Sequence, residues 1–415
     1  MGEAVSPYLH LYIYISISSV LIGICGIVIF AGKPIPSMLP HTFRRTMATK
    51  IPTSFKSIIY STHNVDDCSS VLSLHNYTAA EDLNSSIVVR TLAFPINPSD
   101  VNQLQGVYPS LPLKTMNYST EVPSAIAGNE AVFEVIHTPR NSSGNLKKGD
   151  WVIPLQANQG TWSNYRVFPD SSHLIKVNGL DLFSAATVSV NGVTAYQLVN
   201  NFVKWNKGQN EWLIQNAGTS GVSKLVTQIA KANGIKTLSV IRDRDNFADV
   251  ASVLEQKFGA TKVISETENN DKIFGKEKLP EILGPDARVR LALNSVGGKS
   301  SSSIARKLEK NALMLTYGGM SKQPVTLPTS LHIFKGLTSA GYWVTELNKK
   351  SPETKIKTVQ EFIELYKSDK IVSPKNEIET VEWDVEKDSD DDVLGMVKNA
   401  INKKGKKQMV VLKWD

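Results

Sequence analysis

Residues 212–231 read WLIQNAGTSGVSKLVTQIAK, a short apolar run, a glycine-rich turn and then a helical pattern. Leu225, Val226 and Ile229 recur at the spacing of one helix face. A strand, a glycine-rich turn and a helix start, in this order, can bind a pyrophosphate, because the turn lets the backbone approach closely and the helix offers N–H groups. Alone the motif is weak, since Ser223 stands where a third small residue is expected.

The alternation of strand and helix continues beyond this unit. Apolar runs predict strands, and amphipathic stretches between them predict helices. Strands that alternate with helices argue for a parallel, doubly wound sheet in an α/β fold. The expected strands are 235–241, 259–264, 289–298 and 312–319, and the expected helices lie around 247–258 and over 301–310.

The flanking sequence has a different character. Residues 51–190 hold short β-branched or aromatic runs punctuated by Gly, Pro and Asn, and residues 408–414 again form a strand-like run. Such runs predict a β-rich domain, into which the nucleotide-binding domain is inserted. The expected ranges are 1–50 for a leader, 51–188 and 346–415 for the two parts of the β-rich domain, and 189–345 for the inserted domain.

The end of the next predicted strand indicates which nucleotide is bound. The run 235–241 leads into Arg242, Asp243 and Arg244, and Arg242 lies 24 residues after Gly218. Enzymes that use NAD usually place an acid here, on the ribose hydroxyl. Arginine instead suits a 2′-phosphate, because its planar fork makes paired charge-assisted bonds. The strand end therefore favours NADPH, with a solvated Arg–Asp turn as the alternative.

A second glycine-rich turn, Tyr317-Gly318-Gly319-Met320, ends a later predicted strand. The carboxyl ends of parallel strands line the ligand crevice of such a sheet. Backbone close to a nicotinamide would explain the two glycines, although any tight turn can use a glycine pair.

Composition narrows the function classes. Apolar residues make up 41% of the 415 residues, the formal charge is +7, and there are two cysteines and seven histidines. Two cysteines exclude a four-cysteine zinc site, and the histidines show no ligand spacing, so no metal is expected. The basic run Lys403, Lys404, Lys406 and Lys407 is interpreted as a solvated surface. No basic face with stacking aromatics is present, so nucleic acid is not expected as a partner.

The amino-terminal region carries two conflicting signals. Residues 11–30 contain no charge and are long enough to span a bilayer core. From Met38 onward the chain is basic, rich in hydroxyl groups and free of acids as far as Asp66, which is typical of a transit peptide. We expect the working start to be Met38 or Met47 and the destination to be the mitochondrial matrix. Membrane contact is expected only if residues 11–30 are retained.

From about Arg90 to the C-terminus the sequence resembles the mitochondrial 2-enoyl thioester reductases of yeasts, within the zinc-free medium-chain dehydrogenase/reductase superfamily. The resemblance implies a GroES-like β-rich catalytic domain, an inserted Rossmann-type doubly wound domain that binds NADPH, and a homodimer. The motifs that carry it are FPINPSDVNQLQGVYPS (94–110), GNEAVFEV (128–135), GDWVIP (149–154), GTWSNY (160–165), VNGVTAY (190–196), QNAGTSGVSK (215–224), SVIRDR (239–244), ALNSVGGKSS (292–301), LTYGGMSKQPVTLPTS (315–330) and SAGYWVTEL (339–347).

The family reduces the C2=C3 double bond of 2-enoyl thioesters on acyl carrier protein or coenzyme A. Hydride goes to C3 and C2 must then gain a proton, which an acid that stays protonated at neutral pH can deliver. The resemblance assigns this role to Tyr108 in the GVYP loop. From the residues alone, Tyr108 is an aromatic that could simply pack at a domain edge.

The resemblance also implies the remaining site residues. Trp343 is expected to line an acyl pocket as well, since a flat apolar wall suits a fatty chain, with plain core packing as its alternative. The expected cofactor contacts are Asn191, Ser220, Gly221, Val222, Ser223, Arg242, Asp243, Arg244, Tyr317, Gly318, Gly319, Met320, Tyr342, Trp343, Val344 and Lys407.

The sequence departs from the family pattern at two of these places. Asn191 is followed by Gly192 where Asn-Pro is usual, and Ser223 replaces a glycine, so that its hydroxyl could bond the pyrophosphate. Three other interpretations stay open: a zinc-free NADPH quinone reductase, a non-catalytic NADPH-binding protein, and a membrane-tethered reductase of the secretory pathway.

Overall fold

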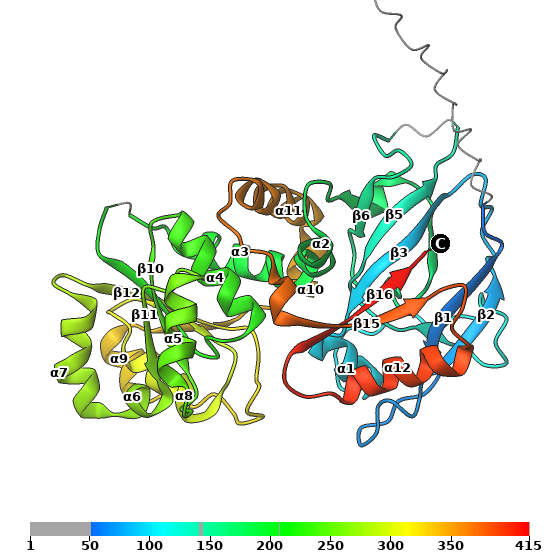
Figure 1. The fold of residues 1–415 in the computed structure, drawn as a ribbon. Coiled ribbons are helices and arrows are strands. Elements are labelled where there is room, and N and C mark those ends of the chain that lie inside the picture. Colours follow the sequence, from blue (N-terminus) through cyan, green and yellow to red (C-terminus); the bar gives the residue numbers. More distant parts are fainter. Residues whose placement is uncertain (1–50, 141–143, 207, 415) are drawn as a thin grey trace, which may run out of the picture. The chain divides into compact units, whose positions relative to one another are not determined.

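The computed structural model describes residues 51–140, 144–206 and 208–414. The expected leader, with its apolar segment 11–30, lies outside these residues. Within the described part, no helix has both the length and the apolar character needed to cross a membrane. Two large sheets, one parallel and one mostly antiparallel, organise this part of the chain (Figure 1).

The parallel sheet has six strands in the order β11-β10-β9-β12-β13-β14. Each neighbouring pair is parallel. The order reverses between β9 and β12, which is where doubly wound sheets bind their ligands. The expected doubly wound domain is therefore confirmed. Its strands are β9 (Glu211–Gln215), β10 (Lys236–Ile241), β11 (Lys262–Ser265), β12 (Arg288–Asn294), β13 (Leu313–Thr316) and β14 (Thr338–Gly341).

Strand β9 is buried along its whole length, because both faces of the sheet are covered. Leu213 belongs to an apolar cluster shared with Val226 and Ile229. Trp212 and Ile214 point to the other face, into a cluster shared with other helices. Side chains alternate along a strand, so these two clusters show helices packed on both faces.

Several boundaries differ from expectation. The expected strands 289–298 and 312–319 end earlier, at Asn294 and Thr316. The expected strand 259–264 starts later, at Lys262, because Gly259 has a φ of +78° and ends the preceding helix in a left-handed turn. The expected helix 301–310 begins earlier, at Gly298, and ends at Arg306. There the side chain of Asn294 accepts the N–H groups of Val296 and Gly297, which shapes the turn into the helix.

The second large sheet follows the order β15-β16-β3-β5-β6-β8, with β7 also paired to β3. The last strands return to it from the C-terminal end of the chain, since Val410 pairs antiparallel with Phe94. The parallel sheet is thus inserted within the β-rich domain. The strands are β3 (Ile87–Pro95), β5 (Val132–His137), β6 (Trp151–Pro154), β7 (Tyr165–Phe168), β8 (Leu174–Lys176), β15 (Ile378–Asp384) and β16 (Lys407–Lys413).

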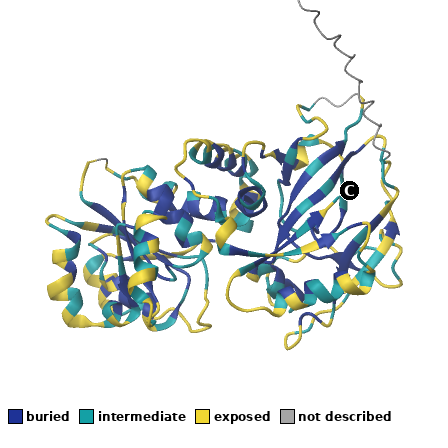
Figure 2. Ribbon diagram, viewed as in Figure 1, coloured by how far each residue is buried: buried dark blue, intermediate teal, exposed yellow. Residues whose placement is uncertain are grey.

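A small antiparallel sheet completes the β-rich domain, in the order β2-β1-β4. The strands of the large sheets are largely buried, whereas the helices carry exposed residues (Figure 2). The remaining elements are β1 (Ser54–Tyr60), β2 (Ser73–Thr78), β4 (Ala125–Ile126), α1 (Pro98–Leu104), α2 (Leu182–Thr187), α3 (Val193–Asn200), α4 (Gly221–Ala232), α5 (Phe247–Gln256), α6 (Glu266–Asn270), α7 (Lys272–Leu283), α8 (Gly298–Arg306), α9 (Thr329–Lys335), α10 (Val344–Lys350), α11 (Pro352–Lys367), α12 (Asp390–Asn402), the π-helical turn η2 (Val188–Gly192), and the short 3₁₀ turns η1 (Ser171–His173) and η3 (Pro374–Glu377).

Candidate functional site

The glycine-rich turn connects β9 to α4 and packs tightly against β10. A Cβ atom at Gly218 would lie 2.9 Å from Cγ2 of Ile241 and 3.0 Å from Cβ of Ser239. No side chain fits there without a shift of the neighbouring strand. The glycine therefore lets the turn approach the sheet at the carboxyl end of β9, beside the point where the strand order reverses.

The start of α4 offers backbone donors. Ser220 caps the helix, and its hydroxyl oxygen accepts the backbone N–H of Ser223 (3.2 Å). The first N–H groups of a helix have no partner within the helix, so those of Gly221 and Val222 can face an anion such as a pyrophosphate. Ser223 is fully buried, and its hydroxyl lies 3.4 Å from the hydroxyl of Tyr317. The hydroxyl groups of this turn that are not fully buried belong to Thr219 and Ser220, both half-buried.

Asn191, in the π-helical turn η2, lies directly against this helix start. A Cβ atom at Gly221 would lie 3.0 Å from Nδ2 of Asn191. The missing side chain at Gly221 therefore lets the amide of Asn191 reach the first turn of α4. The structure brings together two of the expected cofactor contacts that are 30 positions apart in the sequence.

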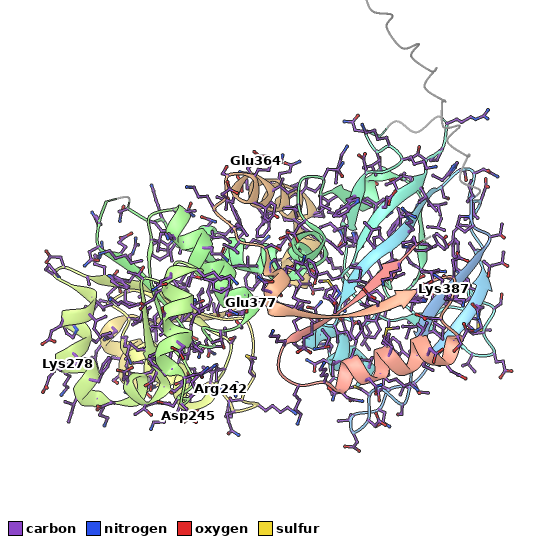
Figure 3. The ribbon with its side chains drawn as sticks, viewed as in Figure 1. Arg242, Asp245, Lys278, Glu364, Glu377 and Lys387 are labelled. Atoms are coloured by element: carbon purple, nitrogen blue, oxygen red, sulfur yellow. The ribbon has the colours of Figure 1, made fainter. Side chains whose placement is uncertain are left out.

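The segment after β10 presents two arginines, and the exposed acid between them is bonded to a backbone N–H. Oδ2 of Asp243 accepts the backbone N–H of Thr267 (3.1 Å). Burial opposes ionisation of Asp243, but the hydrogen bonds from Thr267 outweigh it and lower the pKa. Arg242 is exposed (Figure 3) and Arg244 half-buried, and in the described part of the chain neither forms an ion pair. Nε of Arg244 donates to the carbonyl of Arg242 (3.2 Å), and guanidinium groups outside ion pairs fit a phosphate ester.

The second glycine-rich turn packs on the end of β12. A Cβ atom at Gly318 would lie 3.2 Å from Cβ of Ser295, whereas one at Gly319 would meet no atom within 4 Å. Met320 is exposed, and its N–H bonds the carbonyl of Ser295 (2.9 Å). The turn thus has one side fixed to the sheet and one open side. With the Tyr317–Ser223 contact, both glycine-rich turns lie at the same edge of the parallel sheet.

Tyr108 lies in the loop after α1, and its hydroxyl meets residues that follow β14. The indole N–H of Trp343 donates to the Tyr108 hydroxyl oxygen (2.8 Å), and the two rings meet edge to face with centroids 6.0 Å apart. Oγ1 of Thr345, which the sequence did not single out, lies 3.4 Å from the same oxygen. An indole can only donate, so this contact leaves the phenolic proton free to be donated elsewhere.

Trp343 keeps 36% of its surface exposed. A plain core tryptophan would be buried, so an exposed face is available to a ligand beside Tyr108. Tyr342 is different: it is buried, and its hydroxyl donates to Oε1 of Gln197 (2.9 Å). Val344 is half-buried at the start of α10. Of these three neighbours, Trp343 is the one whose side chain is accessible.

Lys407 corrects one interpretation of the sequence. Lys403, Lys404 and Lys406 are exposed as expected, but Lys407 is half-buried and its ammonium group donates to Oδ1 of Asn97. Strand β16 turns this side chain inward. Burial lowers the pKa of Lys407, which nearby Glu130 and Asp100 partly oppose. The run of four lysines is therefore not one solvated surface.

The two buried acids beside Lys407 were not anticipated as site residues. Asp100 and Glu130 are 1% and 0% exposed. Glu130 sits in GNEAVFEV, where an acid directly before an apolar strand was the available signal. In the described residues, no group of three or more His, Cys, Asp or Glu side chains is placed to hold a metal ion.

Comparison with known proteins gives close relatives. No protein-family model matches the sequence. The mitochondrial enoyl-[acyl-carrier-protein] reductases of Candida glabrata and Saccharomyces cerevisiae are 71% and 70% identical to it, over 92% and 91% of this chain and 100% of each relative. A protein of Kluyveromyces marxianus named NADPH quinone oxidoreductase is 61% identical over 86% of this chain and 94% of that protein.

Solved structures agree with this result. An enoyl thioester reductase in complex with NADP and crotonyl-CoA superposes with a TM-score of 0.80 at 41% identity, over 86% of this chain and 99% of that chain. The mitochondrial 2-enoyl thioester reductase heterodimer of Candida tropicalis gives the same values. A NADPH:quinone reductase structure from Bacillus thuringiensis, at 22% identity and a TM-score of 0.67, shares the fold.

Proposed function

The chain belongs to the mitochondrial 2-enoyl thioester reductases of the zinc-free medium-chain dehydrogenase/reductase superfamily, and we propose that Tyr108 is its proton donor. The protein is a mitochondrial oxidoreductase that reduces the C2=C3 double bond of enoyl thioesters with NADPH, in mitochondrial fatty acid synthesis. The observation that carries the assignment of Tyr108 is its hydroxyl, held by the indole of Trp343 at 2.8 Å on an accessible surface.

NADPH, when bound, supplies the hydride that C3 of the substrate accepts. The residues that would hold it are arranged at one edge of the parallel sheet. The first-turn N–H groups of α4 would hold the pyrophosphate, and the amide of Asn191 lies at the same helix start. Arg242 and Arg244 would hold the 2′-phosphate, while Asp243 accepts the backbone N–H of Thr267. This arrangement favours NADPH over NADH, because the two arginines attract the 2′-phosphate strongly and NADH lacks that phosphate.

Tyr108 completes the reduction on the substrate. As C3 gains hydride, negative charge develops on the thioester oxygen and C2 becomes the atom that needs a proton. The Tyr108 hydroxyl accepts from Trp343, so its own hydrogen can be directed to C2. Trp343 also offers its exposed face as a wall for the acyl chain. Oγ1 of Thr345 lies 3.4 Å from the Tyr108 hydroxyl and can relay a proton to it from solvent.

We further propose a homodimer joined along the parallel sheet. All four residues of β14, the edge strand, are exposed. An exposed edge strand presents unpaired backbone groups that favour pairing with another strand. Ile333 and Phe334 on the adjacent α9 are 66% and 73% exposed, which adds an apolar surface beside the edge. Light scattering should give the mass of two chains, and Phe334→Glu should shift it to one.

The carrier of the acyl group is proposed to be acyl carrier protein in the cell, with coenzyme A thioesters as accepted substitutes. The curated relatives are named for the acyl carrier protein substrate, and the solved complex holds crotonyl-CoA. A comparison of kcat/KM for the same enoyl chain on both carriers tests this order of preference.

The test of the function is oxidation of NADPH by the purified protein with trans-2-hexenoyl-CoA. We expect rapid turnover with NADPH and much slower turnover with NADH. A quinone serves as the second substrate, because a relative at 61% identity is named for quinone reduction. Turnover with the quinone that survives Tyr108→Phe, together with no turnover of the enoyl thioester, would contradict the proposal, since quinone reduction needs no protonation of carbon.

A further inference from the structure

A buried network of polar side chains lies behind the loop that carries Tyr108. The amide nitrogen of Gln103 donates to the carbonyl of Ser110 (2.7 Å) and to Oδ1 of Asn158 (2.8 Å). Nδ2 of Asn158 donates to the hydroxyl of Ser110 (2.7 Å). Ser110 is two residues from Tyr108, so these three bonds fix the part of the loop that sets the direction of the phenol.

The network continues inward to a buried acid. The backbone N–H of Asn158 donates to Oδ1 of Asn129 (3.2 Å). Nδ2 of Asn129 donates to Oε1 of Gln103 (2.6 Å) and to Oδ1 of Asp100 (2.8 Å). Asp100 also accepts the backbone N–H of Asn97 (2.8 Å). Each of these groups is satisfied by another, which a buried polar network requires to be rigid.

Glu130 joins this network to the cofactor side of the site. One carboxylate oxygen accepts Nδ2 of Asn97 (3.0 Å), and the other accepts the backbone N–H of Val190 (2.7 Å). Val190 immediately precedes Asn191, whose amide lies at the start of α4. A continuous path of hydrogen bonds thus runs from Ser110, near the proton donor, to the turn η2 at the cofactor site.

The charges around Glu130 are few and all buried. Burial raises the pKa of Glu130 to about 7, while Lys407, Asn97 and Val190 favour its ionised form. Lys407 shares Asn97 with it. Lys355 bonds the carbonyls of Pro154 and Leu155, and burial lowers its pKa to about 8, which Glu130 partly opposes. Burial of a carboxylate is energetically unfavourable. Its presence here therefore indicates that this position needs an acidic side chain, which an apolar residue would not replace.

We propose that Glu130 is a positioning residue that holds the Tyr108 loop and the cofactor turn η2 in one fixed geometry. It does not touch the reacting atoms. It sets the distance over which the proton and the hydride are delivered to neighbouring carbons of the same double bond. A small misplacement of either group lowers the rate strongly. This inference rests on the proposed role of Tyr108 and adds the residue that couples it to the cofactor.

The test compares two variants, each of which removes hydrogen bonds at one end of the path between Ser110 and η2. Glu130→Gln keeps the size and one acceptor for Val190 but presents a donor to Asn97 and leaves Asp100 as the remaining counter-charge of Lys407. Asn158→Gly removes the bonds to Ser110 and Gln103, and glycine readily adopts the φ of +62° found at this position. Glu134→Gln is the control, because Glu134 lies four residues after Glu130, on strand β5, and pairs with Arg90 outside the network.

We expect Glu130→Gln to weaken NADPH binding about tenfold, measured by fluorescence titration without substrate, and to lower kcat about tenfold. Asn158→Gly should lower kcat about tenfold and leave NADPH affinity unchanged, because it acts only on the loop. The double variant should lose no more kcat than the larger single loss, since both changes break one path. Glu134→Gln should match the wild type in both measurements.

Additive losses of kcat in the double variant, or wild-type NADPH affinity in Glu130→Gln, would overturn the inference. Thermal unfolding with and without NADPH guards against general damage: a merely structural role lowers stability in both variants and does not separate cofactor affinity from kcat. If Glu130→Gln does not fold, Asn97→Ser is used instead, because it removes the amide that donates to Glu130. The inference then requires that this variant also binds NADPH more weakly. A wild-type protein that binds NADPH but does not reduce the enoyl thioester contradicts the proposed function, and the affinity measurements then still decide the role of Glu130.

Discussion

The two sides of the candidate site are built in different ways. The cofactor side consists of short continuous stretches, the glycine-rich turn at 216–223 and the arginines at 242–244, and it acts through backbone groups and exposed side chains. The proton-donor side brings together Tyr108 and Trp343, which are 235 positions apart, and rests on buried groups such as Glu130. Cofactor binding therefore depends on local geometry, whereas delivery of the proton depends on contacts distant in sequence.

The largest expected effect is on the proton-donor side. Tyr108→Phe removes the hydroxyl and keeps the ring, so the edge-to-face contact with Trp343 can persist. We expect kcat to fall about 1000-fold, as for the loss of a general acid, with NADPH affinity unchanged. Stopped-flow turnover and fluorescence titration measure the two quantities. If NADPH affinity also fell, the cofactor side and the proton-donor side would not act independently.

A second effect concerns stability, and it originates from the buried acid. The pKa of Glu130 is raised from 4.5 to about 7. A raised pKa means that the folded protein binds this proton more tightly than the unfolded chain does. The contribution to stability is thus fully present below about pH 4.5 and is lost as the pH rises through about 7, a change on the order of 3 kcal/mol.

Urea denaturation at about pH 5 and about pH 8 should show this fall in the free energy of unfolding, and Glu130→Gln should reduce it because an amide does not titrate. Glu134→Gln, which changes a half-buried carboxylate on the adjacent strand β5, should keep the wild-type pH dependence. Equal pH dependence in the wild type and Glu130→Gln would show that Glu130 stays ionised in the folded protein.

The same contrast explains what the sequence could predict. Strands β9, β10, β12 and β13 were predicted because a buried parallel strand is a continuous apolar run, which can be seen without knowledge of the fold. The resemblance supplied Tyr108, since an aromatic in a loop has no chemical signature of its own. Thr345 was not found, because its relevance comes only from a contact across the fold.

Lys407 shows most clearly what could not be predicted from the local sequence. Its neighbours form a basic run that is typical of a solvated surface, and three of the four lysines are exposed. The fourth is only half-exposed because β16 pairs with β3 and turns that side chain toward Asn97, 310 positions earlier in the chain. Local composition carries no information about such a pairing. The boundary errors at β11 and α8 have a smaller cause, namely turns at Gly259 and Gly297 with positive φ.

A third effect tests the cofactor side alone. Replacing Arg242 and Arg244 together by alanine should weaken NADPH binding more than about 100-fold, because each charge-assisted pair to a phosphate contributes roughly 1.5–3 kcal/mol. Binding of NADH should change little, and kcat at saturating NADPH should stay close to that of the wild type. Arg288→Ala is the control, since Arg288 pairs with Glu309 (2.9 Å) at the opposite end of β12. Equal losses of affinity for NADPH and NADH would show that these arginines do not bind the 2′-phosphate.

The smallest expected effect separates a glycine required by packing from one that is not. Gly218→Ala places a Cβ atom 2.9 Å from Ile241 and should lower the free energy of unfolding by about 1–3 kcal/mol. Gly275, inside α7, has no atom within 4 Å of the same added carbon, so Gly275→Ala should raise stability by about 0.5–1 kcal/mol through helix propensity. Chemical denaturation measures both changes. If Gly218→Ala is as stable as the wild type, the turn can move away from β10, and its tight packing is then not what sets the geometry of the cofactor side.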